Sequence, residues 1–338
     1  MDLTTSYVGY ISLLIFILAY ALVMVEEFSH LRKSKPVIIS AALIWGVIAF
    51  YYVSVPGSHS QKVEQALEHN VLEFAELFLF LLSAMTYINA LQERNVFDVV
   101  RYKLISRGFN FRQLFILTGV LTFFLSPIAD NLTTSLVMCS VLLACGKGNV
   151  KFLSLGCINI VVAANAGGAF SPFGDITTLM VWQKGLVDFQ QFFALFVPSL
   201  VNYVIPAVIM SFAIKNEKPA KVEDRIVIKN GGVVITFMFL LTIATAVSFH
   251  NYLHLPPAMG MMTGLGYLMV VGYFVRRRDS LAEPTSERFD IFRKIASAEW
   301  DTLLFFFGVI VSVGGIGFMG YLALVSEAMY VQLGATYA

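Results

Sequence analysis

Charged side chains are scarce in this chain. Asp, Glu, Lys and Arg make up only 13% of its 338 residues, and 58% of the residues are hydrophobic, whereas soluble domains carry about 25% charged residues. The formal net charge is only +1, so the charge balance gives no indication of a nucleic-acid partner. This composition excludes an ordinary soluble domain and predicts an all-α polytopic membrane protein that is surrounded by membrane lipid.

Cysteine is equally sparse. The three cysteines, Cys139, Cys145 and Cys157, are odd in number and include no C-x-x-C pair, so neither a disulfide framework nor a zinc site is indicated. We interpret them as small apolar packing residues. The first 25 residues also lack a basic start and a small-residue cleavage site, and they are predicted to form a spanning helix rather than a cleaved signal.

Long apolar runs, in contrast, are abundant. A spanning helix needs about 20 apolar residues, and such runs occupy residues 6–25, 37–55, 71–91, 192–214, 233–250, 257–275 and 303–325. Two further apolar regions, 113–146 and 152–182, are interrupted by polar residues. Residues 113–125 give a half-helix of about 20 Å, which is too short to cross a hydrocarbon core about 30 Å thick. We therefore predict a re-entrant hairpin over 113–146 and a broken helix over 152–182.

The basic residues set the predicted topology. With one hairpin that returns and one broken helix that crosses, every Lys and Arg except Lys62 and Lys184 falls on one side of the membrane, in the connections 26–36, 92–112, 147–151, 215–232 and 276–302. Because basic loops stay in the cytoplasm, the N-terminus is predicted to lie outside. If both regions crossed, or both returned, the last two loops would change sides. Lys147 and Lys151 favour the first region as the hairpin.

The order of these elements predicts an inverted-repeat transporter. Residues 1–214 would form the first repeat, with three spans, the hairpin, the broken helix and one more span. Residues 215–232 would be a cytoplasmic linker, and 233–338 would begin a second repeat of opposite orientation. The sequence reaches Ala338 before a second hairpin and a second broken helix. We therefore expect it to be the front part of a longer protein, truncated at its C-terminal end.

The first interruption is SPIADNLTT, residues 126–134. Its candidate site residues are Asp130, Asn131, Thr133 and Thr134. An ionisable group inside a membrane segment is costly and usually faces a pathway or a partner. Carboxylate, amide and hydroxyl oxygens suit a hard cation, and a broken helix adds freed carbonyls. Alternatively, Asp130 serves only as the N-cap of the second hairpin helix.

The second interruption, residues 165–178, has a similar composition. Its candidate site residues are Asn165, Gly167, Ser171, Asp175, Thr177 and Thr178. Glycines permit close backbone approach, and Pro172 prevents a continuous helix. Asp175 can again be read as an ordinary helix cap. Taken together, the two interruptions predict that something polar is held inside the membrane, most simply Na⁺ at Asp130 and Asp175.

Two smaller polar groups lie outside the interruptions. His69, Glu73 and Glu76 share one helix face at spacing i, i+4, i+7, and Glu299 and Asp301 flank the start of the 303–325 helix. Each group is a candidate proton or cation pathway. Each also has a plain alternative, because the first fits a solvated helix end and the second complements a helix dipole.

Three motifs carry a family resemblance. SPIADNLTTSLVM at 126–138 and NAGGAFSPFGDITTLMVWQKG at 165–185 closely resemble the signatures of NhaD-type Na⁺/H⁺ antiporters, and EWDTLLFFFGVIVSVGGIGFMGYL at 299–322 is similar to that family. The resemblance implies membership of the ion transporter superfamily and exchange of cytoplasmic Na⁺ or Li⁺ for external H⁺ across a bacterial inner membrane, in pH homeostasis. It implies no catalytic residue and no cofactor, with small cations as the transported partners.

The resemblance also implies residue roles. It assigns transport functions to Asp130, Asn131, Asn165, Asp175, Thr177 and Thr178. It places His69, Glu76, Glu299 and Asp301 where the family carries polar residues important for transport. The family's second hairpin and second broken helix do not occur within these residues.

Three functions remain open at this point. In an antiporter, Asp130 and Asp175 would bind Na⁺ when ionised and release it on protonation. In an anion or dicarboxylate transporter of the same superfamily, the site should present cationic or neutral groups, whereas both motifs supply acids and no Lys or Arg. A more remote alternative is an intramembrane aspartyl protease with the two carboxylates as a dyad, although the residues before Asp175 are Pro-Phe-Gly rather than Gly-x-Gly. The oligomeric state is also open, a homodimer included.

Overall fold

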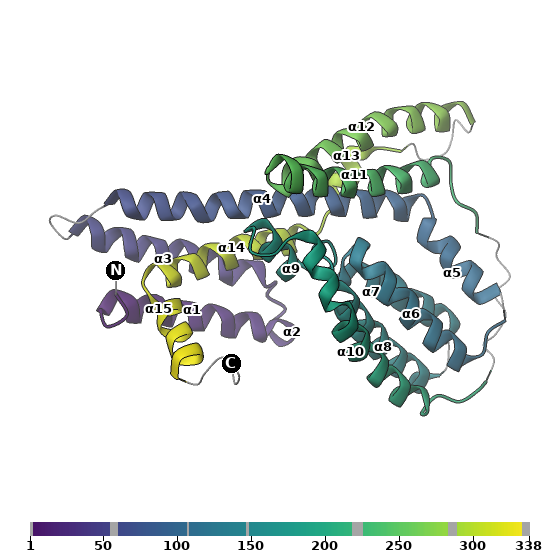
Figure 1. Cartoon of the computed structure of the whole chain (residues 1–338), viewed down its shortest axis with the longest axis horizontal. Coiled ribbons are helices and arrows are strands. Elements are labelled where there is room, and N and C mark those ends of the chain that lie inside the picture. The colour runs from purple at the N-terminus through teal and green to yellow at the C-terminus, as the bar shows by residue number, and fades with distance from the viewer. Residues whose placement is uncertain are drawn as a thin grey trace. The chain divides into compact units, whose positions relative to one another are not determined.

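The computed structural model describes residues 3–54, 60–106, 108–146, 149–217, 226–282 and 289–332, and within these ranges it contains helices and no strand. The longer helices are α1 (Tyr7–Met24), α3 (Ser34–Ser54), α4 (Ser60–Glu93), α6 (Phe111–Ala129), α7 (Asn131–Cys145), α8 (Val150–Gly168), α10 (Phe196–Ser211), α11 (Gly232–Leu253), α12 (Pro257–Ala282) and α14 (Trp300–Phe318) (Figure 1). The shorter elements are α2 (Glu26–Ser29), α5 (Val96–Ser106), α9 (Ile176–Gln183), the 3₁₀-helix η1 (Phe189–Leu195), α13 (Ile291–Ala296), α15 (Tyr321–Ser326) and the π-helical turn η2 (Glu327–Gln332).

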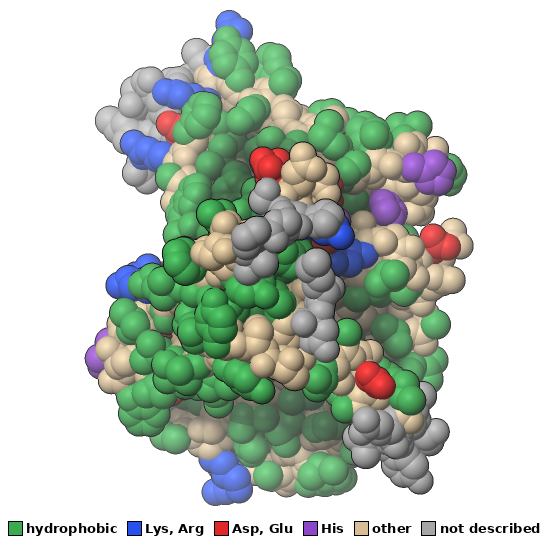
Figure 2. Space-filling view, turned by 90° about the vertical axis from the view of Figure 1, so that its left-hand side faces the viewer, with side chains coloured by type: hydrophobic (Ala, Val, Ile, Leu, Met, Phe, Trp, Pro, Cys, Tyr) green, Lys and Arg blue, Asp and Glu red, His purple; other side chains and the backbone are tan. Residues whose placement is uncertain are grey.

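The helices have the length and surface of membrane spans. In the described ranges, nine helices are long and apolar enough to cross a membrane, which confirms the predicted polytopic class. Large apolar side chains remain exposed on them, as Tyr10, Leu14 and Leu18 are on α1. Figure 2 shows a face on which hydrophobic side chains predominate. A helix satisfies its own backbone groups, so it is the form in which such segments can meet lipid.

Several predicted boundaries were wrong. The half-helix over 113–125 is instead α6, whose 19 residues are about 28 Å long, because Pro127 lies in the last turn and the helix continues past it to Ala129. The predicted span 303–325 ends at Phe318, since Gly320 has a φ of 103° and turns the chain. The spans predicted over 71–91 and 257–275 belong to α4 and α12, which continue beyond the apolar runs into charged residues. The predicted connections 92–112 and 276–302 contain the short helices α5 and α13.

The helices form two compact units. The first unit comprises the residues up to Leu81 together with those from Glu299 onward. In it, α3 packs against α1 and α14, and the Trp45 indole N–H donates to Val311 O at 2.8 Å. Gly308 and Gly315 allow α14 to lie close to α3, because a Cβ at either position would be under 3 Å from an α3 side chain.

The second unit runs from Leu82 to Ala298. Within it, α6, α7, α8 and α10 pack together, and α11 packs along α12. Phe123, Ala163 and Tyr203 lie in an apolar core between α6, α8 and α10. These units follow packing, whereas the predicted repeats at 1–214 and 233–338 would be related by symmetry, so the two divisions describe different properties of the chain.

A buried cluster of charged side chains links three helices of the second unit. Arg94, only 3% exposed, binds Asp279 through Nη1 and Glu93 through Nη2, each at 2.9 Å. Lys294 also binds Glu93, at 2.5 Å, and the Phe289 ring lies 4.7 Å from the Arg94 guanidinium. Arg94 was predicted only as one charge of a basic cytoplasmic connection. The contacts instead join the end of α4 to α12 and the residues around α13.

Candidate functional site

The first interruption forms the turn of a helical hairpin. One residue, Asp130, separates α6 from α7, and the two helices pack against each other. Asp130 has a φ of 53°, a conformation that is uncommon for residues other than glycine. Its carboxylate accepts from the Thr133 amide and the Thr133 hydroxyl, both at 2.8 Å. The helix-cap interpretation of Asp130 is therefore confirmed, and its carboxylate lies at the hairpin tip.

The second interruption separates α8 from α9. Asp175 caps α9 by accepting from the Thr177 amide at 2.8 Å and from its hydroxyl at 2.6 Å. Thr178 donates to the carbonyls of Ser171 and Asp175, both at 2.8 Å. The helix cap expected at Asp175 is thus present as well. The intervening loop is held by its own threonine and serine hydroxyls.

The two interruptions meet at Asn131. The Asn131 side-chain amide donates to Asp175 Oδ2 at 2.7 Å and to Asn165 Oδ1 at 3.1 Å. The Asn131 backbone N–H also donates to Gly174 O at 3.0 Å. The tip of the hairpin and the gap of the broken helix therefore form one polar site.

Small residues and one proline make this approach possible. A Cβ at Gly167 would lie 2.2 Å from the carbonyl oxygen of Phe123. Pro127 has no N–H to donate to that same carbonyl, four residues before it. Gly168 and Gly174 contact each other just as closely, because a Cβ at Gly174 would lie 2.5 Å from the Cα of Gly168. The role that the structure gives Gly167 is thus close packing of α8 on α6.

Two serine side chains hydrogen-bond across the contact between the two interruptions. Ser126 is fully buried and donates to Ala164 O at 2.7 Å, and Ser171 donates to Pro127 O at 2.8 Å. Ser171 was predicted as a site residue, whereas Ser126 was not singled out. Its place directly before Pro127 in the first motif was the available signal.

The site is buried on one side and open on the other. Asp130, Asn131 and Asp175 are half-buried, and Asn165 and Thr177 are exposed. Thr134, also predicted, is 3% exposed, and its hydroxyl has no hydrogen-bond partner among the described residues. Of the predicted residues, the structure brings Asn131, Asn165 and Asp175 into direct contact, with Thr177 on the same carboxylate.

The charges at the site favour a cation. A helix N-terminus carries roughly half a positive charge. Both α7 and α9 begin at this site, and each has an aspartate carboxylate as its N-cap. With both carboxylates ionised, the site would carry about one net negative charge after the two helix ends are counted. In the described part of the chain, no three His, Cys, Asp or Glu side chains gather as a metal site.

The predicted pathway residues lie in the other unit. His69 Nε2 is 2.9 Å from Glu73 Oε1, and the His69 side chain is 70% exposed. The pair is solvated, but it lies within α4 rather than at its end, because α4 begins at Ser60. Asp301 accepts from the Ser34 hydroxyl at 2.5 Å. Glu299 accepts from the Thr302 hydroxyl at 3.2 Å at the start of α14. These residues and Glu76 belong to the first unit, and the interruptions belong to the second.

Comparisons with known proteins agree with this picture. Residues 8–338 match the family described as citrate transporters. The chain is 52% identical to the Na⁺/H⁺ antiporter NhaD of Alkalimonas amylolytica over 98% of the chain and 72% of that protein. It is 53% identical to NhaD of Vibrio cholerae, over 98% of the chain and 73% of the relative. Sodium/proton antiporter 1 of Arabidopsis thaliana is 30% identical over 91% of the chain and 52% of its own length.

Proposed function

Because the chain belongs to the NhaD family of Na⁺/H⁺ antiporters, we propose that it exchanges Na⁺ for H⁺ across the membrane at the site between its two helix interruptions. It is accordingly a secondary transporter and not an enzyme, which removes the aspartyl protease hypothesis. The observation that carries the proposed site is the contact of Asn131 with Asp175 and Asn165. It joins the oxygen ligands of two segments that lie far apart in sequence.

The Asn131 amide suggests how a cation is accommodated. Its Nδ2, the positive end of a dipole, lies between Asp175 Oδ2 and Asn165 Oδ1. Rotation of the amide by half a turn would replace this donor with an acceptor oxygen. The three side chains would then present only oxygen to an entering Na⁺, which is the ligand type that hard cations prefer.

Competition between Na⁺ and H⁺ supplies the exchange. An ionised Asp175 attracts Na⁺, and a protonated one lacks the negative charge that holds it. Asp130 contributes the second negative charge from the hairpin tip. Release of Na⁺ on one side of the membrane then requires uptake of H⁺, and alternating exposure of the site couples the two flows.

The charge balance argues against an anion substrate, although the matching family is described as citrate transporters. Neither interruption contains a Lys or Arg. Helix N-termini can bind anions, but here each is already occupied by its own carboxylate cap. A citrate or dicarboxylate would meet net negative charge at this site.

The proposal includes orientation and selectivity. The N-terminus would lie outside and the basic connections in the cytoplasm of a bacterial cell, with Li⁺ as a second transported ion. The hairpin α6–α7 would return to the cytoplasmic side, as one half of an inverted repeat. His69, Glu73, Glu76, Glu299 and Asp301 would line the route of H⁺ or Na⁺, and two copies would associate as a homodimer.

Charge-removing variants test the site. Everted membrane vesicles containing the protein encoded by its complete gene should show a Na⁺-dependent change of internal pH. Asp175→Asn and Asp130→Asn should abolish this signal, because asparagine still caps a helix but carries no charge.

A matched control is available at Asp290. Its side chain caps α13 by accepting from the Phe292 amide at 3.0 Å, so Asp290→Asn makes the same chemical change away from the site and should retain exchange. Full activity in both site variants would remove Asp130 and Asp175 from the transport site. Uptake of labelled citrate or succinate without Na⁺-dependent H⁺ movement would favour the anion transporter instead.

A further inference from the structure

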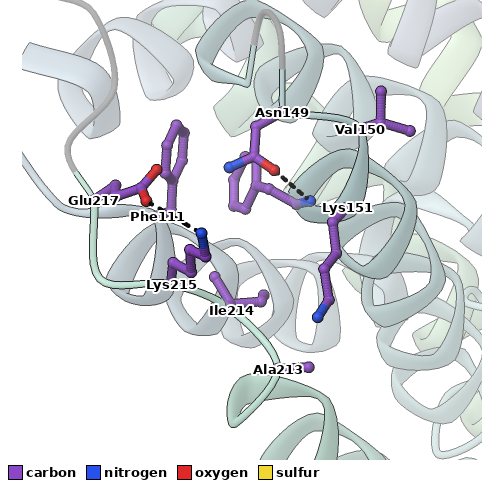
Figure 3. Close-up of a pocket in the computed structure, with 9 residues that line it drawn as sticks. Phe111, Asn149, Val150, Lys151, Ala213, Ile214, Lys215 and Glu217 are labelled. Atoms are coloured by element: carbon purple, nitrogen blue, oxygen red, sulfur yellow. Dashed lines mark hydrogen bonds and ion pairs between the residues drawn. The ribbon is translucent and has the colours of Figure 1, made fainter.

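A separate pocket of about 600 Å³ lies at the opposite end of the hairpin from Asp130. It is formed by the start of α6, the start of α8 and the segment that follows α10 (Figure 3). Its lining includes Phe111, Asn149, Lys151, Ile214, Lys215 and Glu217. The pocket is well separated in sequence from both interruptions and has no part in the proposed ion site.

The pocket has an excess of positive charge. Lys151 enters it from α8 and has no hydrogen-bond or ion-pair partner among the described residues, and Lys215 enters from the segment after α10 (Figure 3). Lys215 is 82% exposed and lies 3.9 Å from Glu217, which is a weak contact for so exposed a pair. Arg112, next to the lining residue Phe111, stacks on Phe212 at 5.3 Å. The lining therefore carries two cations, Lys151 and Lys215, and one carboxylate, Glu217.

In a membrane, the pocket would lie near the depth of the lipid headgroups. Two candidate spans begin at it, Phe111–Ala129 and Val150–Gly168, and a third, Phe189–Ser211, ends beside it. Exposed apolar side chains continue from the pocket along these spans, with Val150 75%, Phe212 73% and Ile209 66% exposed. A phosphate placed between the lysines would thus have an apolar surface directly beside it for acyl chains.

The walls of the pocket are fixed in place. The Phe111 amide donates to Glu217 O at 2.8 Å, which ties the segment after α10 to the first residue of α6. The Asn149 side chain accepts from the Phe152 amide at 3.1 Å and so caps α8. Phe111 and Phe152 pack against each other with ring centroids 4.5 Å apart. The two lysines are therefore presented from a rigid base.

We propose that this pocket binds the phosphate headgroup of an anionic phospholipid, with Lys151 and Lys215 as its ligands and the apolar faces of α8 and α10 against its acyl chains. Basic pockets between spanning helices on the cytoplasmic side commonly take such headgroups. In the orientation proposed above, α6 and α8 begin on the cytoplasmic side and α10 ends there. The bound lipid would hold the base of the hairpin to the end of α10.

Native mass spectrometry of the purified full-length protein tests the site. With phosphatidylglycerol as the probe, we expect a one-to-one complex of higher affinity than with phosphatidylcholine. Lys151→Gln combined with Lys215→Gln should lower the phosphatidylglycerol affinity about 30-fold, because each basic side chain at an anionic headgroup is worth about a fivefold change. Lys229→Gln, an exposed lysine of the same proposed side outside the pocket, should leave the affinity unchanged.

Other outcomes overturn the proposal. Equal binding of the two lipids, or an equal loss in Lys229→Gln, would show that no specific headgroup site exists. Displacement of phosphatidylglycerol by millimolar inorganic phosphate would show that the pocket takes a soluble anion. Lys151→Arg with Lys215→Arg should retain the lipid, and unchanged thermal unfolding in zwitterionic detergent should accompany every variant. A loss of lipid in the arginine variant, with its fold intact, would also contradict the assignment.

Discussion

Substitution of Gly167 by alanine is the sharpest structural test of how the two interruptions meet. The added Cβ would lie 2.2 Å from Phe123 O and 2.9 Å from Phe123 C and Cα. All three are backbone atoms, so no side-chain rotation can relieve the overlap. Because non-bonded atoms are comfortable at about 3.5 Å, α8 must move away from α6 by about 1 Å.

The cost of that movement outweighs the gain in helix propensity. Overpacking a close contact typically costs about 1–3 kcal/mol, whereas replacing a helical glycine by alanine gains roughly 0.5–1 kcal/mol. The expected net effect of Gly167→Ala is a loss of about 1–2 kcal/mol in the free energy of unfolding. The displacement of α8 also moves Asn165 away from Asn131 at the start of α7 and thereby loosens their 3.1 Å hydrogen bond, so Na⁺-dependent exchange should fall.

Gly266 provides the matched control. It lies within α12, in the same unit, and a Cβ there would have nothing within 4 Å. Thermal unfolding in detergent, followed by near-ultraviolet circular dichroism, should show a lower midpoint for Gly167→Ala and an equal or higher one for Gly266→Ala. Identical midpoints and identical exchange rates in the two variants would refute the claim that close approach at Gly167 assembles the site.

Two further predictions concern the second unit. Arg94→Met should lower the free energy of unfolding by about 3–5 kcal/mol, because it leaves the Asp279 carboxylate buried without its partner. Denaturant titration measures this loss. Arg94→Met combined with Asp279→Leu should recover most of it, and no recovery would argue against the ion pair. Cys139 on α7 and Cys157 on α8 belong to helices that pack against each other, so oxidation by copper phenanthroline, which removes two electrons and two protons, should give a 139–157 disulfide in peptide mass analysis. Cys157→Ser should remove it, whereas a disulfide to Cys145 in the wild type would contradict the packing of these helices.

The spanning helices could be predicted because their signal is local. Apolar runs of sufficient length identify them one at a time, and each was found at its expected place. Their ends were harder to predict, since charged residues can continue a helix beyond its apolar part. Ser60–Glu93 and Pro257–Ala282 both extend in this way.

The candidate site was predicted in its composition but not in its connections. The motifs indicated Asp130, Asn131, Asn165 and Asp175 as oxygen ligands, and both aspartates do cap helices. That Asn131 joins the other two depends on the meeting of segments 34 and 44 residues apart. The burial of Arg94 against Asp279 depends on a pairing 185 residues apart. A reading of one segment at a time has no information on such contacts.

Proton release on Na⁺ binding tests the central claim most directly. If Na⁺ and H⁺ compete for the carboxylates at the interruptions, addition of NaCl to the purified protein in weakly buffered solution should release protons, whereas choline chloride should not. Asp130→Asn with Asp175→Asn should abolish the release, and Asp290→Asn should leave it unchanged. Saturable Na⁺ binding without proton release, or the same release from the double variant, would contradict the account.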